Sequence, residues 1–181
     1  MELITSLPIR YCFYLIPLIL LLHELEEWNI YEYHQVTYSN KIPGETKLGG
    51  RLWLIFLSII GFIWTVVCNL IPDVATSAII MMFLIDFSIL NAIQHIGLSI
   101  KTKKYNPGLM FGGFVGFFIA VFEIYKILLD KILPFGIILV MLFLILPGLI
   151  DTIVNSRKGK LPKMVEMILI FSTKLEILFT K

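Results

Sequence analysis

Residues 52–71 read LWLIFLSIIGFIWTVVCNLI, and none of these 20 side chains is charged. A helix of this length is about 30 Å long, which matches the hydrocarbon core of a bilayer. The chain as a whole is 58% hydrophobic and 15% charged, with a mean hydropathy of +0.90. Soluble domains carry about a quarter charged residues, so this chain lacks the polar surface to dissolve such a helix in water. The sequence therefore predicts an integral membrane protein.

Four other apolar runs are long enough to cross a membrane, at about residues 7–28, 74–100, 109–129 and 132–153. Together with residues 52–71 they predict an all-α polytopic transmembrane bundle of about five spans, occupying residues 1–155. Pro17 and Pro147 lie inside two of these helices and predict kinks, because proline has no N–H to donate to the helix.

The tail, residues 156–181, differs from the spans because charged residues interrupt its apolar stretch, which reads LPKMVEMILIFSTKLEILFTK. This pattern favours a cytoplasmic amphipathic helix lying on the inner membrane surface. A sixth span, which would place the C-terminus outside, is the alternative.

Lys and Arg are distributed unevenly between the two sides that five spans define. The N-terminus and the second and fourth loops carry three of the fifteen, namely Arg10, Lys126 and Lys131, and the other side carries twelve. Because positive charge gathers on the cytoplasmic side, we expect a multi-pass cell-membrane protein with its N-terminus outside and its C-terminus cytoplasmic. The net charge of +2, without a basic patch, argues against a nucleic-acid partner.

Ionisable residues interrupt the end of the first apolar run, in the sequence HELEE at residues 23–27. At about 100° per residue, Glu26 and Glu27 lie about 60° and 40° to either side of His23, whereas Glu24 points elsewhere. Three converging ionisable groups in a membrane helix are expected to face protein or a water-filled cavity. The alternative is an interfacial cap whose carboxylates reach the water.

The third run supplies a second polar motif, NAIQH, at residues 91–95. Asn91 and His95 are four residues apart and share one helix face, about 7.5 Å from the cytoplasmic end of the helix. This motif therefore lies at nearly the same depth as HELEE and on the same side of the membrane. We infer that the two motifs form one site near the cytoplasmic face.

HELEE, NAIQH and the later KYNPG at residues 104–108 resemble the HXXEE-motif family of membrane proteins. The resemblance covers most of the chain from His23 to the fourth span and leaves the tail unassigned. It implies no established biochemical function, although the polar motifs suggest an enzyme. The family also has a further, less regular histidine, for which His34 is the candidate. The residues that match the motifs are His23, Glu26, Glu27, Asn91, Gln94 and His95.

The donor set suits a divalent metal such as Zn, Mn or Fe, held by His23, His95 and Glu26 or Glu27. The second glutamate would then be the general base, and Asn91, Gln94 and Asp151 would contact the substrate. Metal-free acid/base chemistry by the same residues is the alternative. His34 would join the site only if the chain broke near residues 28–29 and folded back, since a continuous helix would place it about 16 Å away.

These observations predict a membrane-embedded enzyme, metal-dependent in the leading hypothesis, that hydrolyses a small or amphiphilic substrate or transfers a group from it at the inner leaflet. The alternative is a small proton- or cation-coupled transporter or binding protein that uses the same residues. Three features are expected to be structural only. Asp86 would make an interhelical hydrogen bond, Glu123 would pair with Lys126, and the glycines at 108, 112 and 116 would allow close helix packing.

Overall fold

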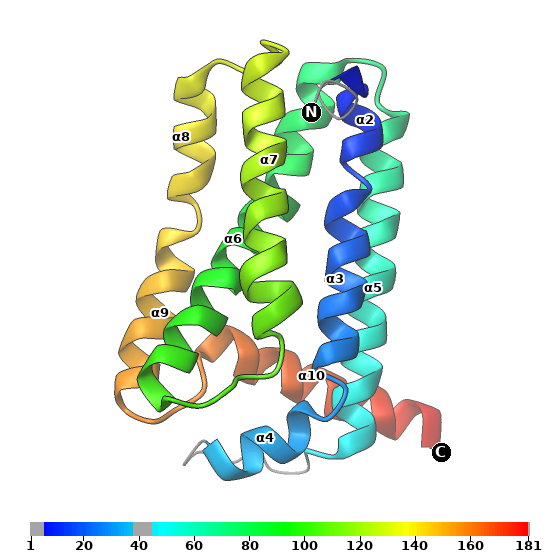
Figure 1. The fold of residues 1–181 in the computed structure, drawn as a ribbon. Coiled ribbons are helices and arrows are strands. Elements are labelled where there is room, and N and C mark those ends of the chain that lie inside the picture. Colours follow the sequence, from blue (N-terminus) through cyan, green and yellow to red (C-terminus); the bar gives the residue numbers. More distant parts are fainter. Residues whose placement is uncertain (1–5, 38–44, 181) are drawn as a thin grey trace.

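The computed structural model describes residues 6–37 and 45–180, and every regular element in them is a helix (Figure 1). Four helical stretches are long and apolar enough to cross a membrane. The prediction of an all-α helix bundle is confirmed, and these four stretches are its candidate membrane spans, where about five were predicted. The four stretches are α5 (Lys47–Leu70), α6 (Val74–Thr102), η1 with α7 (Leu109–Val115 and Gly116–Leu129), and α8 with most of α9 (Phe135–Phe143 and Leu146–Arg157).

The first apolar run is not one long helix, and it is therefore absent from those four stretches. It forms α2 (Ile9–Cys12) and α3 (Leu15–Glu26), which follow each other along α5 in Figure 1. The break at residues 13–14 lies one turn before Pro17, whose missing N–H cannot bond to the carbonyl of Phe13. Pro147 has the same effect between α8 and α9, so both expected kinks occur as interruptions.

Arg10 joins α2 to the end of α5. Its guanidinium donates to the backbone carbonyls of Asn69, Ile71 and Pro72 at 2.5, 2.6 and 2.9 Å, and Asn69 Nδ2 donates back to the Arg10 carbonyl at 3.0 Å. These carbonyls lie at the end of α5, where no following helical turn supplies N–H groups to them. A positive side chain is therefore favourable at this end of the helix.

We expect Arg10→Ala to lower the free energy of unfolding in detergent by about 1–3 kcal/mol, the range for hydrogen bonds to a charged group. The measurement is the midpoint of unfolding, with the exposed Lys158→Ala as the matched loss of a surface cation. Equal midpoints for the two variants would contradict this role of Arg10.

The turn from α5 to α6 is closed by a helix cap. Asp73 accepts from the Thr76 hydroxyl at 2.6 Å and from the Thr76 N–H at 2.7 Å. These two bonds hold the pKa of Asp73 below its usual value. The cap fixes the residue at which α6 begins. Because the helix is rigid, it also fixes the position of His95 along the axis of the bundle.

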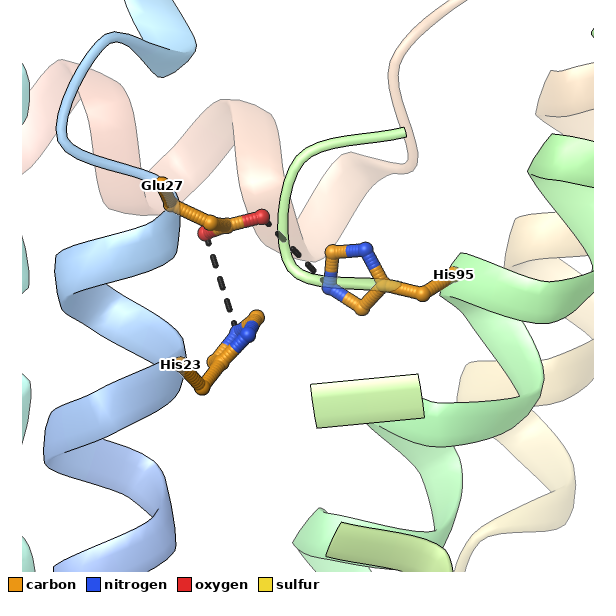
Figure 2. Close-up of side chains that lie close together, drawn as sticks. All are labelled: His23, Glu27 and His95. Carbon is orange, nitrogen blue, oxygen red and sulfur yellow. Dashed lines mark ion pairs between the residues drawn. The ribbon is translucent and has the colours of Figure 1, made fainter. Parts of the chain in front are cut away.

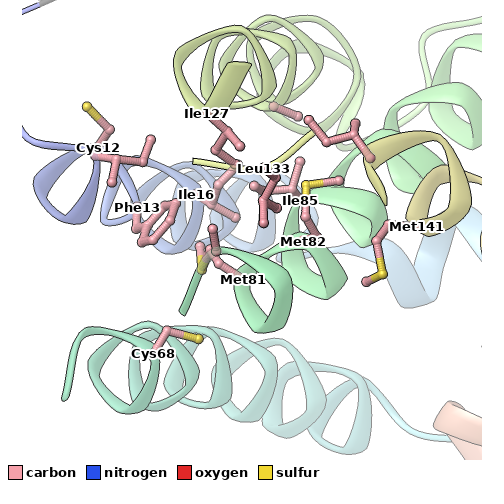
Figure 3. Packing of buried hydrophobic residues seen from close by; sticks show 14 of the residues in the cluster. Cys12, Phe13, Ile16, Cys68, Met81, Met82, Ile85, Ile127, Leu133 and Met141 are labelled. Carbon is pink, nitrogen blue, oxygen red and sulfur yellow. The ribbon is translucent and has the colours of Figure 1, made fainter. Parts of the chain in front are cut away.

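The apolar core occupies the half of the bundle that contains α2, α8 and the start of α6 (Figure 3). Phe13, Met81, Met82 and Ile85 are fully buried there. The larger cavity lies in the other half of the bundle. The other labelled members of the cluster are Cys12, Ile16, Cys68, Ile127, Leu133 and Met141.

Two carboxyl groups in the half of the bundle with the apolar core, those of Glu123 and Asp86, do not make the contacts that the sequence predicted. Lys126 pairs with Asp130 at 2.6 Å and not with Glu123. Glu123 is fully buried, and neither of its carboxyl oxygens has a hydrogen-bond partner within the described residues. Both oxygens of Asp86 are likewise without a partner there, so the expected interhelical hydrogen bond is wrong. Helix position predicted the depth of these groups but not their contacts.

Two helices lie across the end of the bundle opposite α2. They are α4 (Ile30–Thr37) and α10 (Lys163–Thr180), and Figure 1 shows both crossing beneath the long helices. α10 packs against α5 and α9, and Asp151 Oδ2 accepts from the backbone N–H of Lys163 at 2.7 Å. α10 is not among the four stretches suited to crossing a membrane. The tail helix lies against α5 and α9 of the bundle.

Candidate metal centre

Three ligand groups meet where α3 ends (Figure 2). His23 lies on the last turn of α3, Glu27 caps that helix, and His95 lies near the end of α6. Glu27 lies between the imidazoles, with its Oε2 3.7 Å from His23 Nε2 and its Oε1 3.4 Å from His95 Nε2. The ring centroids are 4.8 Å apart at an interplanar angle of 76°.

An asparagine orients each of the two imidazole rings. Asn91 Nδ2 donates to Nε2 of His23 at 2.9 Å, and Asn106 Nδ2 donates to Nδ1 of His95 at 2.9 Å. The contact with Asn91 crosses from α6 to α3 and brings the two sequence motifs together. Asn106 was absent from the predicted site, although it lies in the KYNPG segment that carried part of the family resemblance.

Gly108 and Gly112 leave the space that the imidazoles occupy. A Cβ at Gly108 would lie 2.4 Å from His23 Cε1 and 2.6 Å from His95 Cε1, and one at Gly112 would lie 2.4 Å from His23 Nδ1. Gly108 also has φ +86°, which L side chains rarely adopt. Helix packing was the favoured interpretation of these glycines, whereas the structure places both against the candidate site.

Glu26 does not join the cluster, contrary to its expected role as a ligand or base. Its carboxylate accepts from the backbone N–H groups of Met110 and Phe111 at 3.1 and 2.9 Å, and from the Tyr105 hydroxyl. The first N–H groups of a helix have no partner within that helix. Glu26 therefore caps η1 from another helix and holds the loop with Asn106 and Gly108 against the histidines.

We expect Glu26→Ala to loosen this loop and lower the free energy of unfolding by about 1–3 kcal/mol. Amide hydrogen exchange should become faster at Met110 and Phe111, because both N–H groups lose their acceptor. Glu32→Ala removes an exposed glutamate from α4, outside this loop, and is the matched control. Unchanged exchange in the Glu26 variant would contradict the capping role.

Glu24 faces the site, which corrects the expectation that it points elsewhere. It is buried, its Oε1 lies 4.0 Å from His23 Nε2, and its Oε2 has no hydrogen-bond partner within the described part of the chain. The predicted direction of Glu24 on α3 was correct. The cavity, however, also extends to that face of α3, because α5 and α6 pack against the helix.

The remaining predicted residues lie outside the cluster. Gln94 lines the adjoining cavity and donates to the Thr152 hydroxyl at 2.6 Å. Asp151 is outside the cavity lining and binds the start of α10 instead. The chain breaks at residues 27–29, and α4 folds back so that His34 lines the cavity, where it contacts Glu45 at 3.4 Å. His34 is not part of the ligand cluster.

The three groups offer ligand atoms that all lie within 4.8 Å of one another. Around a tetrahedral Zn²⁺ with bonds of about 2.0–2.1 Å, ligand atoms are about 3.4 Å apart. The Glu27–histidine distances of 3.7 and 3.4 Å involve its two different oxygens, and the full set of ligand atoms spans up to 4.8 Å, so the side chains would have to draw together around an ion. The cluster is nevertheless close enough to bind a metal, with room left for further ligands from the cavity.

A family model described as a protein of unknown function with HXXEE motif matches residues 14–123, more than half of the chain. The chain belongs to the HXXEE family. Within the matched region, the first and last motif positions (His23 and Glu27) form the cluster with His95, and the middle glutamate, Glu26, caps η1. No curated protein and no solved structure matches the chain.

Proposed function

We propose that this HXXEE protein is a membrane-embedded, metal-dependent enzyme that catalyses hydrolysis or a related group transfer. His23, Glu27 and His95 hold a divalent ion, with Zn, Mn and Fe as the candidates. The observation that carries the proposal is the approach of three buried or half-buried ligand groups to within 4.8 Å, from two separate helices.

Electrostatics supports a cation at this place. Glu24 and Glu27 are enclosed side by side, and within the described residues their close basic partners are the two histidines, which are positive only when protonated. Enclosing carboxylates without positive charge is costly. A divalent ion would compensate both carboxylates at once.

The residues around the ion have separate tasks in this proposal. Rotating the Asn106 side-chain amide by 180° exchanges its nitrogen and oxygen. The oxygen would then accept a hydrogen bond from Nδ1–H of His95, and Nε2 of His95 would be free to bind the metal. A metal on His23 Nε2 would take the lone pair that Asn91 now contacts, which frees Asn91 to meet the substrate.

A bound divalent ion would polarise a substrate carbonyl or phosphoryl group and lower the pKa of a bound water. Glu24, which lies beside His23, would be the carboxylate that takes a proton from a water molecule in the cavity, because Glu26 is engaged with η1. In hydrolysis the water oxygen forms the new bond, the bond to the leaving group breaks, and Glu24 returns the proton to the leaving group.

We place the site at the cytoplasmic end of the bundle in the cell membrane, with the N-terminus outside. The end that holds α4, α10 and the loop after α6 corresponds to the side with twelve of the fifteen Lys and Arg residues. Lipid is the surrounding partner, since exposed apolar side chains cover the long helices.

Proton- or cation-coupled transport remains the second candidate function. Asp86 and Glu123 favour it, because both are buried carboxyl groups without a hydrogen-bond partner in the described residues. Asp86 lies nine residues before His95 on α6, about 13 Å further from the site. Such groups could carry protons from the opposite side of the membrane toward the cluster.

The test is the metal content of detergent-purified wild-type protein, prepared without chelator and measured by elemental mass spectrometry beside Glu27→Gln. We expect nearly one ion per chain in the wild type and loss of that ion in the variant, which keeps the shape of the side chain. Reconstitution of the stripped protein with Zn²⁺, Mn²⁺ or Fe²⁺ would then precede hydrolase assays. Absence of metal from both proteins would overturn the proposal, and proton flux in liposomes would be measured instead.

A further inference from the structure

The ligand cluster forms part of the wall of a larger cavity of about 330 Å³. Six helices line it, namely α3, α4, α5, α6, α9 and α10. The proposed metal ligands occupy one wall of this cavity, and most of the other lining residues are apolar. Small-molecule sites measure about 300–1,000 Å³, so this cavity is large enough for one hydrocarbon chain and its polar linkage.

The cavity meets the outside at an apolar rim. Ile93 on α6 and Ile153 on α9 both line the cavity, yet 40% and 51% of their surfaces are exposed. α5 and α9 both supply lining residues but are not among the closely packed helix pairs of the described chain. Because these helices belong to stretches suited to crossing a membrane, an apolar rim here faces lipid. Lipid chains, and not dissolved metabolites, have direct access to such an entrance.

A positive side chain lines this cavity. Arg157, at the end of α9, is the one Lys or Arg among the lining residues that the structure describes, and it is exposed. Thr152 lies five residues earlier and bonds to Gln94, the neighbour of His95. The rise of a helix therefore places Arg157 about 7.5 Å beyond the level of the ligand cluster, toward α10. A bound group at Arg157 could stay hydrated while the attached chain is buried.

The tail closes the same end of the cavity. Leu161, Pro162, Val165 and Leu169 line it, and α10 is held by packing against α5 and α9. Arg157 is the last residue of α9 and adjoins the short segment that leads to α10. A head group bound at Arg157 would therefore lie at the membrane surface. The tail is thus part of the cavity wall.

We propose that the cavity binds an anionic amphiphile with one hydrocarbon chain. The chain enters between α5 and α9, the linkage to the head group lies at His23, Glu27 and His95, and the anionic group binds Arg157. This inference rests on the proposed function for the identity of the reacting position, and it names the substrate class.

The experiment uses full-length protein in lipid nanodiscs, stripped of metal by chelation, so that binding is measured independently of any metal. The probe is a dodecyl phosphate with bromine on its chain, which quenches nearby tryptophan fluorescence. Trp53 lines the cavity, and Trp28→Phe with Trp64→Phe leaves it as the reporter. We expect saturable quenching, and at least tenfold weaker quenching by the uncharged brominated dodecanol.

Two variants test the two ends of the binding site. Arg157→Gln should weaken binding of the phosphate about tenfold and leave the dodecanol unchanged, whereas the neighbouring Lys158→Gln, outside the lining, should change neither. Ile153→Phe should weaken both probes, because the larger side chain fills the entrance and adds no second tryptophan. A fluorescence spectrum matching that of the parent shows that each variant is folded.

Three results would overturn the inference. They are the absence of saturable quenching, equal affinity for the two probes, and equal effects of the Arg157 and Lys158 substitutions. None of these results bears on metal content. A protein that retains one ion per chain but binds no amphiphile would keep the proposed metal centre and lose this substrate class. The reverse result would keep the lipid site and remove the metal.

Discussion

His95→Ala protein should emerge from a chelator-free purification without metal, whereas the wild type retains nearly one ion per chain. The substitution removes one of three ligand groups and leaves His23 and Glu27 to hold the ion alone. Changes in the outer shell of metal sites already cost 10–100-fold in affinity, and loss of a direct ligand costs more. We therefore expect a decrease in affinity of more than about 100-fold.

The same substitution should remove the stabilisation that metal confers on the folded protein. With free metal at about 100 times the dissociation constant, binding stabilises the wild type by about 2.7 kcal/mol. Adding EDTA should therefore lower the unfolding midpoint of the wild type and leave that of His95→Ala unchanged. This readout needs no knowledge of the substrate.

His34→Ala is the matched control for this prediction. His34 lines the same cavity and is buried, but it contacts Glu45 and lies outside the ligand cluster. Its substitution should leave metal content and the EDTA effect intact. Equal metal retention by the two histidine variants would contradict the assignment of His95 as a ligand.

Helical periodicity explains which parts of the site could be predicted. His23 and Glu27 are four residues apart, as are Asn91 and His95, so each pair shares a face whatever the surrounding fold. The apolar runs fixed the depth of both pairs, which is why one site could be inferred from two distant motifs. The family resemblance, which the matched family model confirms, rests on the same residues.

Contacts between distant segments explain what the sequence could not provide. The direction of Glu26 follows from α3, but its partners, the N–H groups of Met110 and Phe111, lie more than eighty residues away. Glu24 appeared to face away because the helix wheel does not show which sides of α3 are covered. No local signal indicates that α10 would line the cavity, since its amphipathic pattern fits a membrane surface equally well.

The loop after α6 shows a signal that could have been used. In KYNPG, Tyr105 donates to Glu26, Asn106 donates to His95, and Gly108 lies against both imidazoles. A glycine after Asn-Pro indicates a turn with positive φ. Nothing in the sequence, however, says which side chains such a turn approaches. That information required the packing of α3 against η1.

Gly112→Ala should disrupt the candidate site, although the residue never contacts the ligand groups through a side chain of its own. A helical Gly→Ala substitution normally stabilises by about 0.5–1 kcal/mol. At Gly112 the new methyl group would lie 2.4 Å from His23 Nδ1, which real Cβ atoms do not tolerate. We expect loss of about 1–3 kcal/mol of stability, as in other overpacked sites, together with loss of metal.

Gly136→Ala provides the control for the loss of a glycine from a helix. Gly136 lies in α8, and a Cβ there would meet no atom within 4 Å. This variant should be as stable as the wild type or slightly more stable, with unchanged metal content. The comparison separates the clash at Gly112 from any general effect of replacing glycine.

A double substitution tests whether the His23 ring is the group that clashes. If it is, Gly112→Ala should cost much less stability in a His23→Ala background, because the ring that opposed the new methyl group has gone. The difference between the single and double variants then measures the coupling of the two positions, expected at about 1–3 kcal/mol. If the losses of stability from the two substitutions were additive, the effect of Gly112→Ala would arise within its own helix. The fit between the imidazole and the glycine would then not position His23.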